Sequence, residues 1–148
     1  MEIRLISQEN ETTKFFAKSL ELNINFFDQW VKLKKDSIAS YKTCFFRINT
    51  EENETLYFYL NNVFITYREE YAEVLFNDNL VIYEQVKKVE ETLKEKKKAI
   101  RQFNKDLFLY NSLKETEYKH FNEHEMLKKQ FEAAKNKVVL DFNLVERK

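Results

Sequence analysis

The apolar residues between Leu20 and Ile48 recur at alternating steps of four and three, with Lys34 as the one interruption. This spacing covers one face of an α-helix. It predicts a first helix over residues 12–48, and the polar run 49–54 predicts the turn that follows it. The members of the row are Leu20, Ile24, Phe27, Val31, Ile38, Tyr41, Phe45 and Ile48, flanked by Phe26, Trp30 and Leu33.

Two further apolar rows follow along the chain. One runs through Leu60, Val63 and Tyr67 and predicts a helix over residues 54–111, and the other predicts a helix over residues 115–148. Between residues 56 and 67 the chain is rich in aromatic and β-branched residues, which have high strand propensity. No hairpin chemistry lies nearby, and the packing of an apolar stripe commonly overrides propensity, so we predict a helix here as well.

The chain of 148 residues contains neither glycine nor proline. Glycine supplies the left-handed backbone of tight turns, and proline ends helices and interrupts strands. Their absence favours long helices with short connections, and it excludes the glycine-rich phosphate loop and the dinucleotide fingerprint. The predicted fold is all-α: an elongated three-helix antiparallel coiled coil that forms one domain over residues 1–148 and dimerises through its apolar stripes. The predicted core and dimer residues are Leu20, Ile24, Phe27, Trp30, Val31, Ile38, Phe45, Leu60, Val63 and Tyr67.

The charges balance overall, with 25 basic and 25 acidic residues, but they are segregated. Residues 49–86 carry 1 basic and 8 acidic residues, and residues 87–114 carry 9 and 4, so their net charges are −7 and +5. A basic helical arm is attracted to anionic phospholipid by roughly 1 kcal/mol for each cation near the surface. The alternative is a solvated helix face on which interleaved acids pair with the lysines. The candidate lipid-binding residues are Lys87, Lys88, Lys94, Lys96, Lys97, Lys98, Arg101 and Lys105.

Other side chains give little sign of chemistry. Cys44 is the single cysteine and is predicted to be a small buried hydrophobe. His120 and His124 lie one helical turn apart, but the spacing lacks a metalloprotease motif, so an exposed helix face is expected instead of a metal site. Asp78 interrupts the second apolar row and predicts a bend or a solvated gap between helices. We therefore expect no enzyme, no metal and no cofactor, and the balanced charge makes nucleic acid an unexpected partner.

The segment Leu75–Lys88 resembles the leucine-rich part of the BAR domain of sorting nexins, and the segments 131–135 and 145–148 are similar to its third helix. The resemblance implies a homodimer, or a heterodimer with a related BAR protein. It also implies a cytoplasmic protein peripheral on endosomal membranes, with a membrane-curvature role. The N-terminus has no signal-peptide pattern, and the chain has no apolar run long enough to span a membrane. The alternative function is that of a cytosolic coiled-coil scaffold or adaptor without lipid activity.

Overall fold

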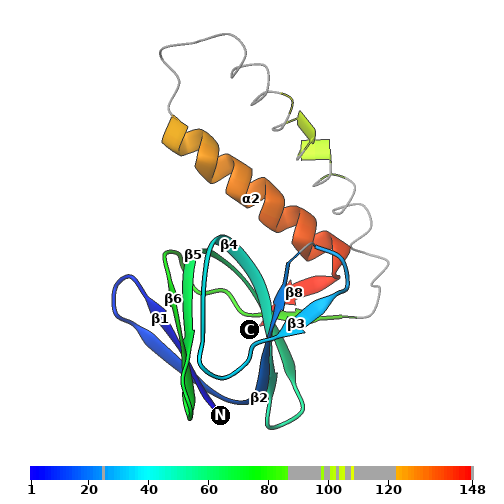
Figure 1. The fold of residues 1–148 in the computed structure, drawn as a ribbon. Coiled ribbons are helices and arrows are strands. Elements are labelled where there is room, and N and C mark those ends of the chain that lie inside the picture. The colour runs from blue at the N-terminus through cyan, green and yellow to red at the C-terminus, as the bar shows by residue number, and fades with distance from the viewer. Residues whose placement is uncertain are drawn as a thin grey trace. The chain divides into compact units, whose positions relative to one another are not determined.

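The computed structural model describes residues 1–24, 26–86, 98, 101–102, 104–105, 108 and 123–147. It divides into two compact units. The first consists of Met1–Gln85 and Leu144–Lys148, and the second consists of Val86–Asn143. The first unit holds the described strands, and the second holds helix α2 (Figure 1).

Five strands of the first unit pair in a closed ring, which Figure 1 shows wrapped around the interior. Each strand pairs antiparallel with the next, and the last closes the ring by pairing parallel with the first. The described strands therefore form a small meander barrel. In ring order they are β1 (Glu2–Ser7), β2 (Thr12–Asn23), β4 (Ser37–Thr50), β5 (Thr55–Tyr67) and β6 (Tyr71–Phe76).

Three short strands extend the sheet beyond this ring. β3 (Trp30–Lys32) pairs with the end of β2, and β7 (Tyr83–Gln85) pairs with β5 at Tyr57. β8 (Leu144–Glu146) pairs antiparallel with β7. The chain thus returns to the first unit after it has passed through the second.

The barrel interior holds an apolar cluster with members from all the ring strands. Phe46 and Phe58 lie at its centre. Both are fully buried, and their rings stack with centroids 5.0 Å apart. Ile3, Leu5 and Val74 are also fully buried. Burial of one such side chain stabilises the fold by roughly 1.5–3 kcal/mol, so this cluster is the main source of the barrel's stability.

Asparagine and aspartate supply the left-handed backbone that glycine provides in most proteins. Asn10 has φ 62° in the turn between β1 and β2, Asn53 has φ 66° in the turn between β4 and β5, and Asp36 has φ 59° before β4. The first turn is closed by the Ser7 N–H, which donates to the Glu11 carbonyl at 2.9 Å. These residue types tolerate the left-handed region because their short polar side chains bond locally. A chain without glycine can therefore still make tight turns.

The all-α coiled-coil prediction is wrong, because strands occupy the predicted helix over 12–48 and the described start of the one over 54–111. Apolar residues with helical spacing also occur in the strands, at two local irregularities. In β2 the register shifts between Ala17 and Ser19, so the core residues Ala17 and Leu20 are three apart. In β5 Asn62 has φ 49°, and the core residues on either side, Leu60 and Val63, are again three apart. Such irregularities give a strand the apolar spacing of a helix.

Helix α2 (Glu123–Asp141) belongs to the second unit and lies within the range predicted for the third helix. It ends at Asp141, and Asn143 follows the last turn with a left-handed backbone (φ 52°), as asparagine often does after helix C-termini. The Phe142 N–H donates to the Val138 carbonyl there, at 3.1 Å. Among the described residues, no helix is both long enough and apolar enough to cross a membrane.

Candidate functional site

The ring of strands opens where β2 and β4 part. β4 pairs with β5 from Ser37 to Asn49, but it pairs with β2 only from Phe45 to Thr50. In the described part of the chain, the edge of Ser37–Cys44 that faces away from β5 therefore has no strand beside it; we call it the open edge. An edge of this kind presents unpaired N–H and C=O groups to any extended chain that approaches it.

A pocket with a volume of about 200 Å³ lies where the two strands part. Apolar and aromatic residues from both strands and from the loop after β2 line it together with two polar residues. The lining residues are Leu22, Asn23, Ile24, Phe26, Tyr41, Thr43, Cys44 and Phe45. An apolar cavity of about 150 Å³ can hold benzene, so this pocket has room for one large apolar side chain. We call the pocket, the open edge and the loop together the notch.

The loop after β2 exposes large apolar side chains, of which Ile24 and Phe26 line the pocket. Ile24 is 63% exposed, Phe26 49% and Phe27 69%. Buried Asn23 fixes the loop, because its Oδ1 accepts a hydrogen bond from the Phe26 N–H at 2.7 Å and its Nδ2 donates to the Phe27 carbonyl. Phe26 has φ 59°, which an aromatic residue rarely adopts and which costs roughly 1–2 kcal/mol. The fold thus holds an exposed aromatic residue in a strained backbone, a combination that clusters at binding sites.

Trp30 anchors the far end of the same loop. Its ring lies 5.1 Å from that of Phe45 and 5.8 Å from that of Tyr57, between centroids. The Arg47 guanidinium lies 4.3 Å from the centre of the Trp30 ring and pairs with the Glu21 carboxylate at 2.8 Å. These contacts hold β3 against the barrel, so both ends of the loop are fixed.

The Cys44 thiol lies in the pocket wall and is buried, as the sequence predicted. Burial raises the pKa of this thiol to about 12, because the charged thiolate loses its solvation inside the protein. A thiol of this kind stays protonated at neutral pH, and the thiolate is the nucleophilic form. Cys44 therefore contributes a wall to the notch and no covalent chemistry.

The structure disperses the residues predicted to form the core and the dimer contacts of the first two helices. Leu20, Phe45, Leu60 and Val63 are buried, whereas Trp30 and Tyr67 are half-buried. The remaining four are exposed, and they lie in or beside the loop and at the open edge: Ile24, Phe27, Val31 and Ile38. Residues that the sequence placed on two helices thus lie partly in the barrel core and partly at or beside the notch.

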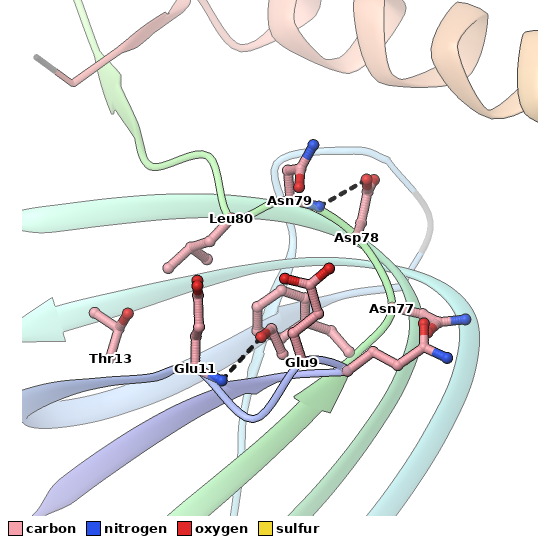
Figure 2. Close-up of a pocket in the computed structure, with 10 residues that line it drawn as sticks. Glu9, Glu11, Thr13, Asn77, Asp78, Asn79 and Leu80 are labelled. Carbon is pink, nitrogen blue, oxygen red and sulfur yellow. Dashed lines mark hydrogen bonds between the residues drawn. The ribbon is translucent and has the colours of Figure 1, made fainter.

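A second pocket, of about 270 Å³, lies at the end of the barrel between the β1–β2 turn and the segment after β6 (Figure 2). Carboxylates of Glu9, Glu11 and Asp78 line it. The Ser7 Oγ accepts a hydrogen bond from the Glu11 N–H at 3.1 Å, and the Asp78 carboxylate accepts one from the Asn79 N–H at 2.8 Å. Within the described part of the chain, no group of three or more histidine, cysteine or acidic side chains is placed to hold a metal ion. Asp78 therefore stands in a loop beside an acidic pocket and not at a helix bend.

Part of the predicted basic arm is described. Lys98, Arg101 and Lys105 have helical backbone and are exposed, and Phe108 is 74% exposed. The other predicted lipid-binding residues lie outside the described residues: Lys87, Lys88, Lys94, Lys96 and Lys97. His120 also lies outside them.

The fold and the notch define a small β-barrel domain in which part of β4 has an open edge. The family model described as the UU051 N-terminal domain matches residues 2–81, and the chain belongs to this family. The match spans β1 to β6 and hence the whole ring of strands. No curated protein matches the chain. The resemblance to the BAR domain of sorting nexins is wrong, since both the family and the barrel differ from it.

The apolar rows of the sequence do not predict the notch, although one local signal points to it. Asn23 and Asp28 bracket the short apolar run that holds Ile24, Phe26 and Phe27. Asparagine and aspartate favour turns, so apolar residues between them indicate an exposed loop tip. No local pattern indicates the open edge, because it depends on where β2 stops pairing with β4.

Proposed function

We propose that this chain is a protein-interaction module that binds an extended segment of a partner protein at the notch, by adding a strand to the open edge of β4. The main-chain groups of the edge would supply hydrogen bonds, and the pocket would accept one side chain of the partner. Strand addition divides recognition in this way, with affinity from the main chain and specificity from a side-chain pocket. The proposal keeps the adaptor class that the sequence offered as an alternative and omits its coiled coil.

The observation that carries the proposal is the coincidence of an open edge with a pocket. The edge runs from Ser37 to Cys44, and Tyr41, Thr43 and Cys44 of this same segment line the pocket. An edge strand that is only structural is commonly blunted or covered. This edge has exposed lysines along it, and the neighbouring loop also presents the exposed apolar side chains of Ile24 and Phe26.

A selection from random displayed peptides on the immobilised full chain tests the proposal. Phe26→Ala removes one wall of the pocket, and Phe16→Ala is its matched control. Phe16 is also an exposed phenylalanine, at 65%, but it lies outside the pocket. We expect selected peptides to lose at least about tenfold in affinity for Phe26→Ala, in line with loss of a buried aromatic contact, and to bind Phe16→Ala like the unchanged chain.

Circular dichroism and thermal unfolding of each variant separate loss of binding from loss of fold. Selected peptides that bind Phe26→Ala and Phe16→Ala with equal affinity would contradict the proposal. The same holds if no displayed peptide is enriched on the folded chain.

A second function rests on the exposed residues of the predicted basic arm. Lys98, Arg101, Lys105 and Phe108 follow at steps of three, four and three, the spacing of one helical face. Cations beside an exposed aromatic residue favour the surface of an anionic membrane. We therefore retain peripheral attachment to anionic phospholipid as a proposal, without the sorting nexin architecture.

Cosedimentation with vesicles of phosphatidylcholine and phosphatidylserine tests this second function. Reversal of Lys98, Arg101 and Lys105 to glutamate is expected to abolish binding at low salt, because the attraction is electrostatic. Reversal of the exposed Lys14, Lys128 and Lys129 serves as the control. If both triple variants sediment like the unchanged chain, the described cations do not bind lipid.

A further inference from the structure

We propose that the segment bound at the notch is acidic and carries one large apolar side chain that fills the pocket. This inference rests on the proposed function and specifies the chemistry of the partner. It follows from the charges along β3 and β4 and from the shape of the pocket.

The chain beside the open edge is basic. Residues 31–44 contain four lysines and one acid, Asp36, which gives a net charge of +3. The lysines are Lys32, Lys34, Lys35 and Lys42, and all are exposed. Within the described residues none of them forms an ion pair, whereas Arg4, Lys14, Arg47 and Arg147 of the same unit each pair with a carboxylate.

Unpaired cations along a binding edge create a positive potential that favours an acidic partner and speeds its association. An extended chain that pairs with Ser37–Cys44 would pass between Lys34 and Lys35 at one end and Lys42 near the other. Acidic residues on both sides of the anchor would then lie near these lysines. The positive charge along the edge thus favours a partner segment with negative charge.

The pocket supplies the second half of the recognition. Its volume of about 200 Å³ suits a single aromatic or large aliphatic side chain. The exposed Ile24 and Phe26 form its rim, and Ile38, which is 74% exposed, stands farther along the open edge. A bound segment would cover these apolar surfaces, which are otherwise in contact with water.

Lysines on an open strand edge have a second known use, which is to prevent two edges from pairing. A notch of this kind could also accept the open edge of a second copy of the chain. Neither alternative predicts that an acidic peptide binds at the notch, so peptide binding distinguishes both from the inference. The test below therefore measures peptide binding and self-association together.

Fluorescence anisotropy with labelled peptides of about ten residues, the length of a long added strand, tests the inference on the full chain. The probe alternates threonine and valine, has a central phenylalanine and carries two glutamates at each end. Matched peptides replace the phenylalanine with alanine, or the glutamates with lysines. We expect each replacement to weaken binding at least about tenfold, and about 0.5 M salt to weaken binding of the acidic probe.

The matched protein variants reverse Lys34, Lys35 and Lys42 at the notch, or Lys105, Lys128 and Lys129 in the second unit. The first triple variant is expected to lose the acidic probe and to gain the lysine-ended peptide, whereas the second should behave like the unchanged chain. If the acidic and lysine-ended peptides bind the unchanged chain equally, the partner chemistry is wrong but the notch still accepts strands. If no peptide binds and sedimentation velocity shows a dimer that Ile24→Asp disrupts, the occupant is a second copy and both proposals fail.

Discussion

At the scale of single residues, Phe26 links the stability of the fold to the notch. Its left-handed backbone favours asparagine over alanine, since asparagine tolerates that region and alanine pays the full steric cost. We expect Phe26→Asn to exceed Phe26→Ala by about 1 kcal/mol in the free energy of unfolding, measured by urea denaturation. Both variants should bind peptide equally weakly, because both lack the aromatic wall.

The matched pair at Phe16 is the control for that prediction. Phe16 lies in β2 and is not among the residues with positive φ. Phe16→Asn should therefore be no more stable than Phe16→Ala. Equal stability of Phe26→Asn and Phe26→Ala would mean that the loop backbone is not left-handed in solution.

Cys44 is expected to make the barrel less stable at alkaline pH. Burial raises its pKa to about 12 in the folded state, above the value of about 9 expected for the unfolded chain. Between these values the unfolded chain has lost the proton that the folded chain keeps, so stability is complete below about pH 9 and falls as pH rises toward 12. Burial raises the pKa of Tyr59 as well, which adds to the fall at higher pH.

One such group lowers the free energy of unfolding by on the order of 1 kcal/mol for each pH unit between its two pKa values. Urea denaturation of the unchanged chain and of Cys44→Ala between about pH 8 and pH 11 measures it. The alanine variant should show the shallower decline. Parallel declines would show that the thiol is not buried as described.

At the scale of elements, the β1–β2 turn tests whether asparagine replaces glycine. Asn10 has φ 62°, and its side chain is exposed. Asn10→Gly should leave the free energy of unfolding nearly unchanged, whereas Asn10→Val should lower it by roughly 1–2 kcal/mol. A valine variant as stable as the glycine variant would contradict the described turn.

The sequence revealed which residues are apolar but not which element carries them. The step of three from Ala17 to Leu20 comes from a strand irregularity, and the step from Leu60 to Val63 spans the left-handed Asn62. Steps of three match those of a helix in sequence, whereas a regular strand alternates every two residues. The register shift between Ala17 and Ser19 breaks that alternation in β2. The strand propensity of residues 56–67 is the correct signal there, and the helix prediction sets it aside for lack of hairpin chemistry and in favour of the apolar stripe.

The notch was harder to foresee than the barrel. Its open edge exists because β2 stops pairing with β4 beyond Asn23 and Phe45, which are far apart in sequence. Sequence periodicity describes one element at a time and carries no information on where two strands diverge. By contrast, the burial of Cys44 depends mainly on its own apolar surroundings and was predicted correctly.

At the scale of the whole molecule, β7 and β8 form a two-strand ladder from which the second unit departs and to which it returns. Gln85 pairs with Leu144, and the Val86 N–H donates to the Asn143 carbonyl at 2.9 Å. The two ends of the second unit are therefore adjacent. Replacement of Val86–Asn143 by an Asn-Gly turn would join the strands as a two-residue hairpin.

We expect this shortened chain to keep the barrel folded, because all the described residues of the core cluster belong to the first unit. Far-ultraviolet circular dichroism should retain the strand signal, and unfolding should remain cooperative. It should also keep peptide binding at the notch, whose lining belongs entirely to the first unit. An unfolded shortened chain would show that the barrel requires the second unit.

The central claim is that a partner segment adds a strand to the open edge of β4, and amide hydrogen exchange measured by NMR tests it most directly. In an antiparallel ladder the N–H groups of successive residues point alternately to the two sides of the strand. Within Ser37–Cys44 of the free chain, amides directed toward β5 should therefore exchange slowly, and those directed toward the open edge should exchange rapidly. Saturation with the acidic peptide should protect the second set at least about tenfold, since those amides gain hydrogen bonds. If the peptide saturates the chain and those amides still exchange at their free rates, strand addition at β4 is contradicted.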